Sequence, residues 1–303
     1  MLKLKMKLFG WVEADSSDYR LAYQTLGGNF STHPDALEFQ HRHADLQPRY
    51  FVSRHPDNHI QGAICFWRDK IVANSLPTRS MLKESGIPVP SDELLLPIEC
   101  QLMLPAYLKT LSALHAQQVI NSSVKMNSGR EICLAKGMGE GGFSRKAKYS
   151  RKRELNKFLE AGGEVRPHCD FNSKELIDIY FELYHMRRGK YPLNRELNVL
   201  FVEGLRNNIF GNILFFKGTP CAFQLIVMAE SPNWITFDYI NIGVDQQFSE
   251  YSPGSILSWI NISEAWDLCQ KKGKVMRYSF GNPSSSYKDQ WCYRESLRRV
   301  WSL

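Results

Sequence analysis

The second half of the chain carries the clearest pattern of hydrophobic and polar positions. An apolar stripe at helical spacing follows Ser150, which we expect to cap a helix that ends at the glycine pair 162–163. A short strand is expected over 163–167. Asn172 followed three residues later by Glu175 has the spacing of a capping box, and the apolar stripe behind it predicts a second helix ending near residue 186.

Three runs of β-branched and aromatic residues come next, separated by turn sequences. They cover 213–216, 222–228 and 234–242. The short turns favour antiparallel pairing. A helix over 255–271, opened by the sequence Ser-Pro-Gly at 252–254, leads to a strand over 275–280, so this last unit predicts a parallel crossover. A final strand is expected over 298–301.

The first half repeats this pattern more faintly, which suggests a tandem duplication. Strands are expected at 10–13, 49–53 and 60–67, with helical spacing between the first two. The alternation of Leu2, Leu4, Met6 and Leu8 with lysines predicts another strand with a basic outer face. The alternative is a basic segment that lies against anionic lipid.

These elements predict an α/β (α+β) fold in which each half is a mixed, splayed β-sheet flanked by helices. We expect the halves to span residues 1–140 and 141–303. The region between them is glycine-rich over 137–142 and then carries six basic residues and no acid over 145–153. Its glycines match no phosphate-binding fingerprint, so a connecting loop is expected.

Composition narrows the class of protein. A hydrophobic fraction of 43% and a charged fraction of 23% are those of a globular protein, and exclude wholesale disorder, collagen and coiled coil. The net charge of +7 permits an anionic partner such as a nucleotide, a nucleic acid or a membrane surface. Seven widely spaced cysteines without C-x-x-C favour reduced thiols.

The sequence also bears on location and on metal binding. It has neither a signal-peptide core nor a run of ~18 apolar residues, so a cytoplasmic protein without a transmembrane helix is expected. The closely spaced pairs His41/His43 and His55/His59 are candidate zinc ligands. Because Pro56 prevents a helix through the second pair and no cysteine lies at ligand spacing, we expect no metal.

The segment Val244–Leu257 resembles motif A of GNAT-type acyltransferases. Val244 and Leu257 match its ends and Gly254 its last glycine, whereas Tyr251 and Ser252 replace the Arg/Gln and the first glycine of its loop. In that family, main-chain N–H groups at the helix start bind the pyrophosphate of the acyl donor. The resemblance implies a donor site, formed by Val244, Tyr251, Ser252, Gly254 and Ser255.

A second resemblance concerns the same half. The sequence S-P-G before a helix, followed after the next strand by Y-K-x-x-W at 287–291, is similar to Fem-type aminoacyl-tRNA-dependent ligases, which contain two GNAT-like domains. Several stretches, among them SPGSILSWIN and YKDQWC, further resemble the macrophage-inducible antimicrobial-peptide-resistance proteins of Gram-negative bacteria. This implies acyl or aminoacyl transfer to an amine, resistance to cationic peptides and peripheral contact with the inner membrane.

Three residues are the candidate catalytic groups. Lys288 would stabilise the oxyanion that forms on the donor carbonyl, as the Fem resemblance implies, and Tyr287 would protonate the leaving group. Asp238, an acid in the middle of a predicted strand, would deprotonate the amine. The alternatives are a solvated lysine, a packing tyrosine and an aspartate paired with an arginine.

Three further residues are candidates for substrate binding. Asn241, on the same predicted strand, would bind amide groups. Arg187 and Arg188 would bind an acceptor phosphate, or would merely offset the dipole at the end of their helix.

The donor remains open between acyl-coenzyme A and aminoacyl-tRNA, and the basic run at 145–153 would suit a tRNA backbone. The rival hypothesis is a non-catalytic GNAT-like scaffold that binds a membrane surface or a peptide. The oligomeric state does not follow from the sequence.

Overall fold

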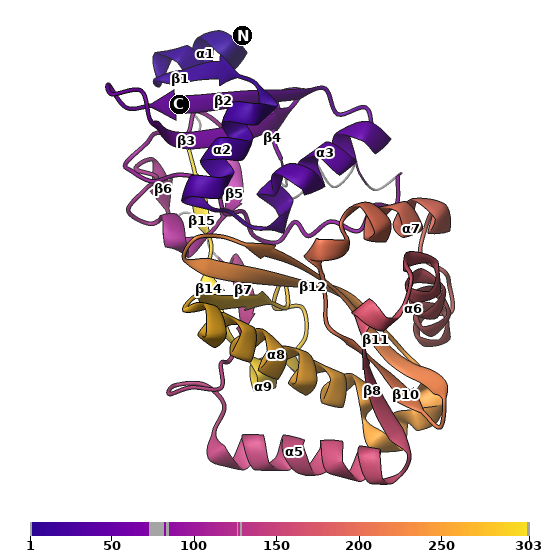
Figure 1. Cartoon of the computed structure of the whole chain (residues 1–303). Helices are drawn as coiled ribbons and strands as arrows, with labels where there is room; N and C mark the ends of the chain where they lie inside the picture. Colours follow the sequence, from indigo (N-terminus) through magenta and orange to yellow (C-terminus); the bar gives the residue numbers. More distant parts are fainter. Residues whose placement is uncertain (1, 73–81, 83–84, 126, 128, 302–303) are drawn as a thin grey trace.

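The computed structural model describes residues 2–72, 82, 85–125, 127 and 129–301. Two α/β halves lie one above the other in Figure 1, the first around a four-stranded sheet and the second around an eight-stranded sheet. A small three-stranded sheet lies between them. The predicted α/β class is confirmed.

The first half is an antiparallel sheet with helices packed against it. The sheet order is β1 (Trp11–Ala14), β2 (Pro48–Arg54), β3 (Ile60–Trp67) and β4 (Lys70–Ile71). Its helices are α1 (Leu2–Leu8), α2 (Ser16–Leu26), η1 (Phe30–Thr32) and α3 (Pro34–His43). The small sheet has the order β5 (Leu108–Leu111), β15 (Arg298–Val300) and β6 (Ser122–Ser123), with η2 (Ala113–His115) between β5 and β6.

The strand predicted for Leu2–Leu8 is wrong, because this segment is the helix α1. Only Met6 is buried, and Leu4 and Leu8 are 67% and 75% exposed, so the alternating leucines do not share a buried sheet face. Leucine and lysine are good helix formers, and this propensity outweighs the short alternation.

The second half holds the larger sheet, in the order β14-β7-β13-β12-β11-β10-β8, with β9 also paired to β11. Its strands are β7 (Glu131–Ala135), β8 (Gly163–Pro167), β9 (Ile209–Phe210), β10 (Asn212–Phe216), β11 (Thr219–Glu230), β12 (Trp234–Val244), β13 (Val275–Ser279) and β14 (Cys292–Ser296). Its helices are α5 (Arg145–Glu160), η3 (His168–Asp170), α6 (Ser173–Arg188), α7 (Arg195–Gly204), η4 (Arg206–Asn208), η5 (Gln246–Tyr251), α8 (Pro253–Lys272) and α9 (Lys288–Trp291).

The two faces of this sheet are covered by different helices. Along β11, Leu225 packs in the core that contains α6, while its neighbour Ile226 packs in the core that contains α8. The predicted meander is antiparallel, and β12 pairs with β13 in parallel across α8, as expected. The helix α5 runs along the outside of α8 (Figure 1).

The predicted cap at Ser150 is wrong, since Ser144 caps α5. The Ser144 side chain accepts a hydrogen bond from the N–H of Ala147, and the helix begins six residues earlier than expected. The basic run at 145–153 is therefore the first half of a helix rather than part of a loop. Lysine and arginine are good helix formers, so nothing in the run prevents this.

The glycine-rich loop before α5 is built by close backbone packing. A Cβ on Gly142 would lie 1.9 Å from the carbonyl oxygen of Gly137, and one on Gly137 would lie 2.3 Å from the Trp266 ring of α8. Close packing therefore accounts for these glycines without a bound ligand, which agrees with the expected connecting loop.

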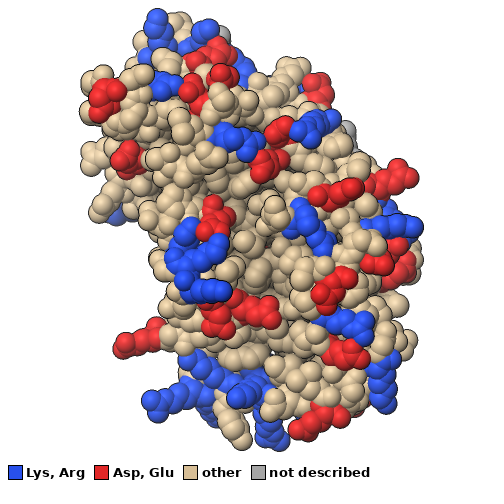
Figure 2. Space-filling view, in the orientation of Figure 1, with Lys and Arg blue, Asp and Glu red and all other residues tan. Residues whose placement is uncertain are grey.

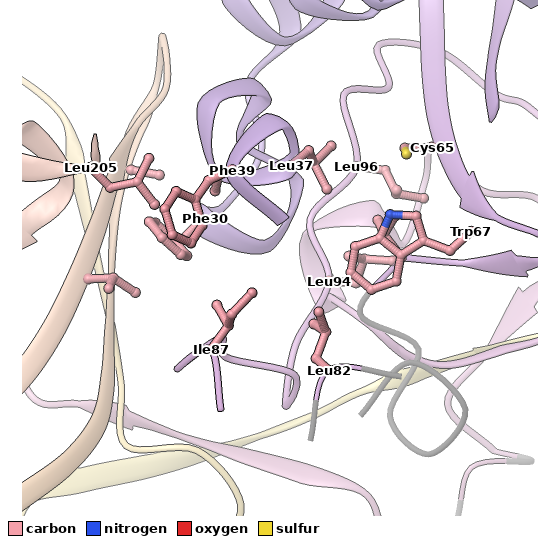
Figure 3. Close-up of a cluster of buried hydrophobic side chains, with 14 of the residues drawn as sticks. Phe30, Leu37, Phe39, Cys65, Trp67, Leu82, Ile87, Leu94, Leu96 and Leu205 are labelled. Atoms are coloured by element: carbon pink, nitrogen blue, oxygen red, sulfur yellow. The ribbon is translucent and has the colours of Figure 1, made fainter. Parts of the chain in front are cut away.

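The two halves share one core. A single cluster of buried side chains runs from α2 and α3 of the first half to α6, α7 and β11 of the second. Figure 3 shows part of it, with Phe30 and Phe39 beside Leu205 and the Trp67 ring beside Leu94. Sheet pairing also crosses the boundary expected at residue 140, because β7 pairs with β13 and β14, while β15 pairs with β5 and β6.

Among the helices of the described residues, none combines the length and the apolar character that crossing a bilayer requires.

Candidate functional site

The larger sheet parts between β12 and β13. Their parallel register runs from Trp234↔Val275 to Asp238↔Ser279. There β13 ends, while β12 continues for six more residues to Val244, and no other strand of the described residues pairs with this side of it. The helix α8 begins beside the gap.

A β-bulge lies at the same point on the opposite edge of β12. Leu225 of β11 pairs with Asn241, and Ile226 pairs with Tyr239, so Ile240 has no partner on β11. Bulges re-aim side chains and are frequent at functional sites. Here the bulge and the parting of the strands coincide within three residues.

A cavity of about 360 Å³ opens beside the parted strands and the start of α8. We call it the α8 cavity; its walls are Arg187, Tyr239, Ile242, Val244, Gln246, Ser249, Ser252, Pro253, Gly254, Ser255, Ser258, Tyr287 and Trp291. Four of the five predicted donor residues therefore line one cavity. The fifth, Tyr251, instead packs its ring against Phe158 and Phe216.

The start of α8 offers fewer main-chain donors than a pyrophosphate cradle needs. Pro253 has no N–H, and the N–H of Ser255 already donates to the carbonyl of Ser252 at 2.9 Å. Of these first positions, only the N–H of Gly254 has no partner among the described residues. Ser252 itself takes the left-handed conformation, φ +53°, that the family's glycine would adopt easily.

Arg187 and Arg188 are separated by the end of α6. Arg187 lines the α8 cavity and donates from Nη1 to the carbonyl of Ile242 at 3.0 Å, which satisfies one main-chain group of the parted edge. Arg188 is exposed and lines neither this cavity nor the second one described below.

Tyr287 and Lys288 lie side by side in the chain but differ in their surroundings. Tyr287 lines the α8 cavity, and partial burial raises the pKa of its hydroxyl further above neutral pH, where the group is protonated. Lys288 is buried, and its Nζ donates to the carbonyls of Phe280 and Asn282, both at 2.6 Å. It therefore holds the chain that follows β13, directly beyond the point where the strands part.

Asp238 occupies the last position of β12 that pairs with β13. It is buried, and its Oδ2 has no hydrogen-bond partner among the described residues. Burial, with the charges of Glu93 and Asp92 added, raises its pKa to about 8. Asp238 therefore carries a proton at pH 7 and accepts one only at higher pH.

A second cavity, of about 560 Å³, lies where α6 meets the first half. We call it the α6 cavity; Tyr180, Tyr184 and Asn241 belong to its wall, and so do Gln40 and Ser91 of the first half. Sequence reasoning missed all of these except Asn241. The spacing of Gln40 does indicate burial, because it lies three residues after Leu37 and four after Ala36, on the buried face of its helix.

The two histidine pairs that suggested a metal site differ in their surroundings. His41 accepts a hydrogen bond from Trp67 Nε1 at 2.9 Å, and burial lowers its pKa to about 4. His55, Asp57 and His59 lie on the exposed turn between β2 and β3, with their ligand atoms within 4.8 Å of one another, a spacing that could hold a divalent cation. This group lines neither cavity.

Solved structures with the same overall fold exist at low sequence identity. FemX matches with a TM-score of 0.56 and 9% identity over 96% of this chain and 97% of its own. L-PGS from Bacillus licheniformis matches with a TM-score of 0.50 and 13% identity over 96% of this chain and 93% of its own. A sequence search found no match among curated proteins. These likenesses confirm the tandem GNAT-like fold predicted from the sequence.

A family model, described as Mig-14, matches residues 33–299. This range includes every residue that lines the α8 cavity, and every residue that lines the α6 cavity except Ser31. The chain belongs to the Mig-14 family.

Proposed function

We propose that this protein is an acyl- or aminoacyltransferase that acts on an amine. The amine nitrogen attacks the carbonyl carbon of an activated ester or thioester, a C–N bond forms, and the bond from that carbon to the leaving oxygen or sulfur breaks. The proton lost by the amine goes to the leaving group. Such a reaction needs positioning and oxyanion stabilisation more than covalent catalysis.

The observation that carries the proposal is the parting of β12 and β13 at Asp238 beside the α8 cavity. An extended donor could enter there and place its carbonyl next to main-chain groups of β12. Tyr287 has the protonated hydroxyl that a donor to the leaving group needs. Lys288 is proposed to place Phe280 and Asn282 at the gap, and its third N–H remains for the oxyanion.

The α8 start supports an aminoacyl-tRNA donor over acyl-coenzyme A. With one unpartnered N–H at Gly254 among the first positions of α8, it does not provide the consecutive donors that bind a pyrophosphate. The helix α5 adds a second argument. Its Arg151 lies over the ring of Trp291, which lines the α8 cavity, at 4.5 Å.

The exposed side of α5 has the properties of an RNA-binding surface. Four of its cations, Arg145, Lys146, Lys152 and Arg153, are exposed, and none has a carboxylate partner among the residues described. Tyr149 between them is 72% exposed, as a ring that stacks on a base would be. Figure 2 shows Lys and Arg side chains gathered at the lower edge of the molecule, where Figure 1 places α5.

Removing two of these cations is expected to weaken RNA binding. The double variant Arg145→Gln/Lys152→Gln should bind unfractionated tRNA about 10-fold less tightly at 50 mM salt, with a shallower salt dependence, because each lost phosphate contact lowers the slope by about one. Filter binding over a KCl series measures both. Lys174→Gln/Lys271→Gln removes the same charge from α6 and α8 and should change little; equal losses in both variants would contradict an RNA surface on α5.

A graded series at Gly254 tests the α8 cavity. A Cβ there would lie 3.4 Å from Ile242 and 3.6 Å from Val244, both ordinary contacts, so Gly254→Ala should fold and keep its activity. Gly254→Leu extends toward the same wall, narrows the cavity and should lower transfer about 100-fold or more at an unchanged Tm. Transfer of labelled amino acids from bulk charged tRNA to envelope extracts measures this, and a fully active Gly254→Leu would refute the donor site.

Peripheral contact with a membrane is proposed for α1. Leu4 and Leu8 lie one turn apart on α1 and are exposed, and Lys3, Lys5 and Lys7 surround them, as in helices that lie on anionic bilayers. We expect the protein to co-sediment with vesicles containing anionic lipid and Leu4→Ser/Leu8→Ser to reduce the bound fraction several-fold. Equal binding by both proteins would remove α1 from the proposal.

In a bacterium, attaching a lysine or an arginine to an amine of an anionic envelope component would lower its net negative charge, because the new amide removes one cation and the attached residue brings two. The attraction of cationic peptides would then be weaker. We propose this as the route to peptide resistance. The rival, a non-catalytic scaffold, is favoured by the incomplete pyrophosphate cradle at Gly254. It predicts that Gly254→Leu retains full peptide resistance, whereas the transferase proposal predicts that resistance is lost.

A further inference from the structure

The α6 cavity is the larger of the two cavities, and most of its wall is apolar. Its side toward the first half includes Trp67, Leu82 and Ile87, which Figure 3 shows around the shared core. On the other side lie Tyr180 and Tyr184 of α6. A volume of about 560 Å³ suits a small organic ligand or a short peptide segment.

Two buried polar groups in this wall have no partner. Both side-chain atoms of Gln40, Nε2 and Oε1, are buried without a hydrogen bond to any described residue, although the residue is only 1% exposed. The Oγ of Ser91, which is 5% exposed, is in the same situation. Buried polar groups are almost always paired, so an unpaired amide in a cavity wall marks a place where a ligand supplies the partner.

The cavity is nearly neutral. Among its described wall residues no side chain is a carboxylate, and the one cation, Lys190, is exposed. A glutamine amide offers a hydrogen-bond donor and a hydrogen-bond acceptor side by side. Both are satisfied by a ligand group that also accepts one hydrogen bond and donates another. A peptide amide between apolar groups has this property, whereas a phosphate or a carboxylate does not.

The α6 cavity reaches the point where the donor would react. Asn241 lines the α6 cavity, and Tyr239 and Ile242 line the α8 cavity, so the two cavities meet across the bulged segment of β12. A ligand in the α6 cavity therefore approaches the parted strands from the face opposite to α8.

We propose that the α6 cavity is the acceptor site, and that it binds a short, apolar, amide-bearing chain whose free amine is directed toward Asn241. Gln40 pairs with an amide of this chain and determines the specificity for it. This inference rests on the proposed function, since it names the substrate class of the same reaction.

The test compares two ligands that differ in one atom. The dipeptide leucyl-leucinamide and its depsipeptide analogue, in which an ester oxygen replaces the internal N–H, are titrated into the full chain without any donor. We expect the dipeptide to bind about 10-fold more tightly. In Gln40→Met, which keeps the shape of the side chain and removes its hydrogen bonds, the ratio should fall to about 1–2.

Matched variants make the result decisive. Gln117→Met, the same change at an exposed position, should keep the 10-fold ratio. Leu193→Trp at the exposed rim should weaken both ligands about 10-fold and leave their ratio unchanged, which tests the cavity should Gln40→Met fold poorly. An unchanged ratio in a folded Gln40→Met, equal binding of both ligands by the unmodified chain, or no effect of Leu193→Trp would overturn the assignment.

Binding is measured here without transfer, so the two proposals can fail separately. If the dipeptide binds through Gln40 but receives no group from any donor, the peptide-binding site in the α6 cavity stands and the transferase proposal falls. If transfer occurs to other amines while the dipeptide does not bind, the transferase proposal stands and the α6 cavity is not a peptide-binding site.

Discussion

Removing the carboxylate of Glu93 is expected to lower the free energy of unfolding by about 3–5 kcal/mol. The Arg277 guanidinium of β13 donates from Nε to Glu93 Oε2 at 2.8 Å and from Nη2 to the other carboxylate oxygen and to Glu295 Oε2. The side chains of Arg277 and Glu93 are 7% and 3% exposed, so Glu93→Leu leaves a buried cation that has lost its closest partner. Chemical denaturation measures the loss.

Two controls separate this pair from ordinary surface charge. Glu38→Gln breaks the exposed ion pairs with Arg42 and Arg20 and should cost less than about 1 kcal/mol. The double variant Glu93→Leu/Arg277→Met replaces the whole pair with apolar groups and should recover much of the loss. If Glu93→Leu cost no more than Glu38→Gln, the pair would not be buried as described.

The second large effect concerns pH. The pKa of Asp238, raised by burial to about 8, exceeds its ordinary value of 3.8. Between these values the unfolded chain has released this proton and the folded chain has kept it, so the contribution of Asp238 to stability falls as pH rises from about 4 to 8. Asp238→Asn removes this dependence and should stabilise the protein by on the order of 4 kcal/mol at pH 7.

Denaturation curves of both proteins at pH 4, 6 and 8 test this result. The two stabilities should be similar at pH 4 and diverge steadily toward pH 8. Parallel profiles would show that Asp238 ionises normally. If Asp238 also deprotonates the amine, the transfer rate of the unmodified protein should increase up to about pH 8, and Asp238→Asn should abolish that increase.

Features with local causes were predictable from the sequence. The capping box at the start of α6 forms as expected, with the Asn172 side chain on the N–H of Glu175 at 2.9 Å and the Glu175 side chain on the N–H of Asn172 at 3.0 Å. The antiparallel meander of β10, β11 and β12 was predicted from the turn residues between these strands. The predictions failed where local signals competed: Leu2–Leu8 alternates like a strand but is a helix, and Ser144 rather than Ser150 caps α5.

The candidate site was predictable only in part. Seven of the thirteen residues that line the α8 cavity lie within the motif at 244–257, so a local pattern pointed to this part of its wall. The α6 cavity combines residues from α3, α6 and the segment between the sheets, which only the tertiary fold brings together. The same holds for Glu93 and Arg277, 184 residues apart.

The most direct test of the account is mass spectrometry of lipid and peptidoglycan extracts from cells with the natural chain, with Gly254→Leu and without the protein. The transferase account predicts an amine-bearing envelope component that gains the mass of an acyl or aminoacyl group only when the natural chain is present. Identical extracts from all three strains, at equal protein abundance, would contradict it.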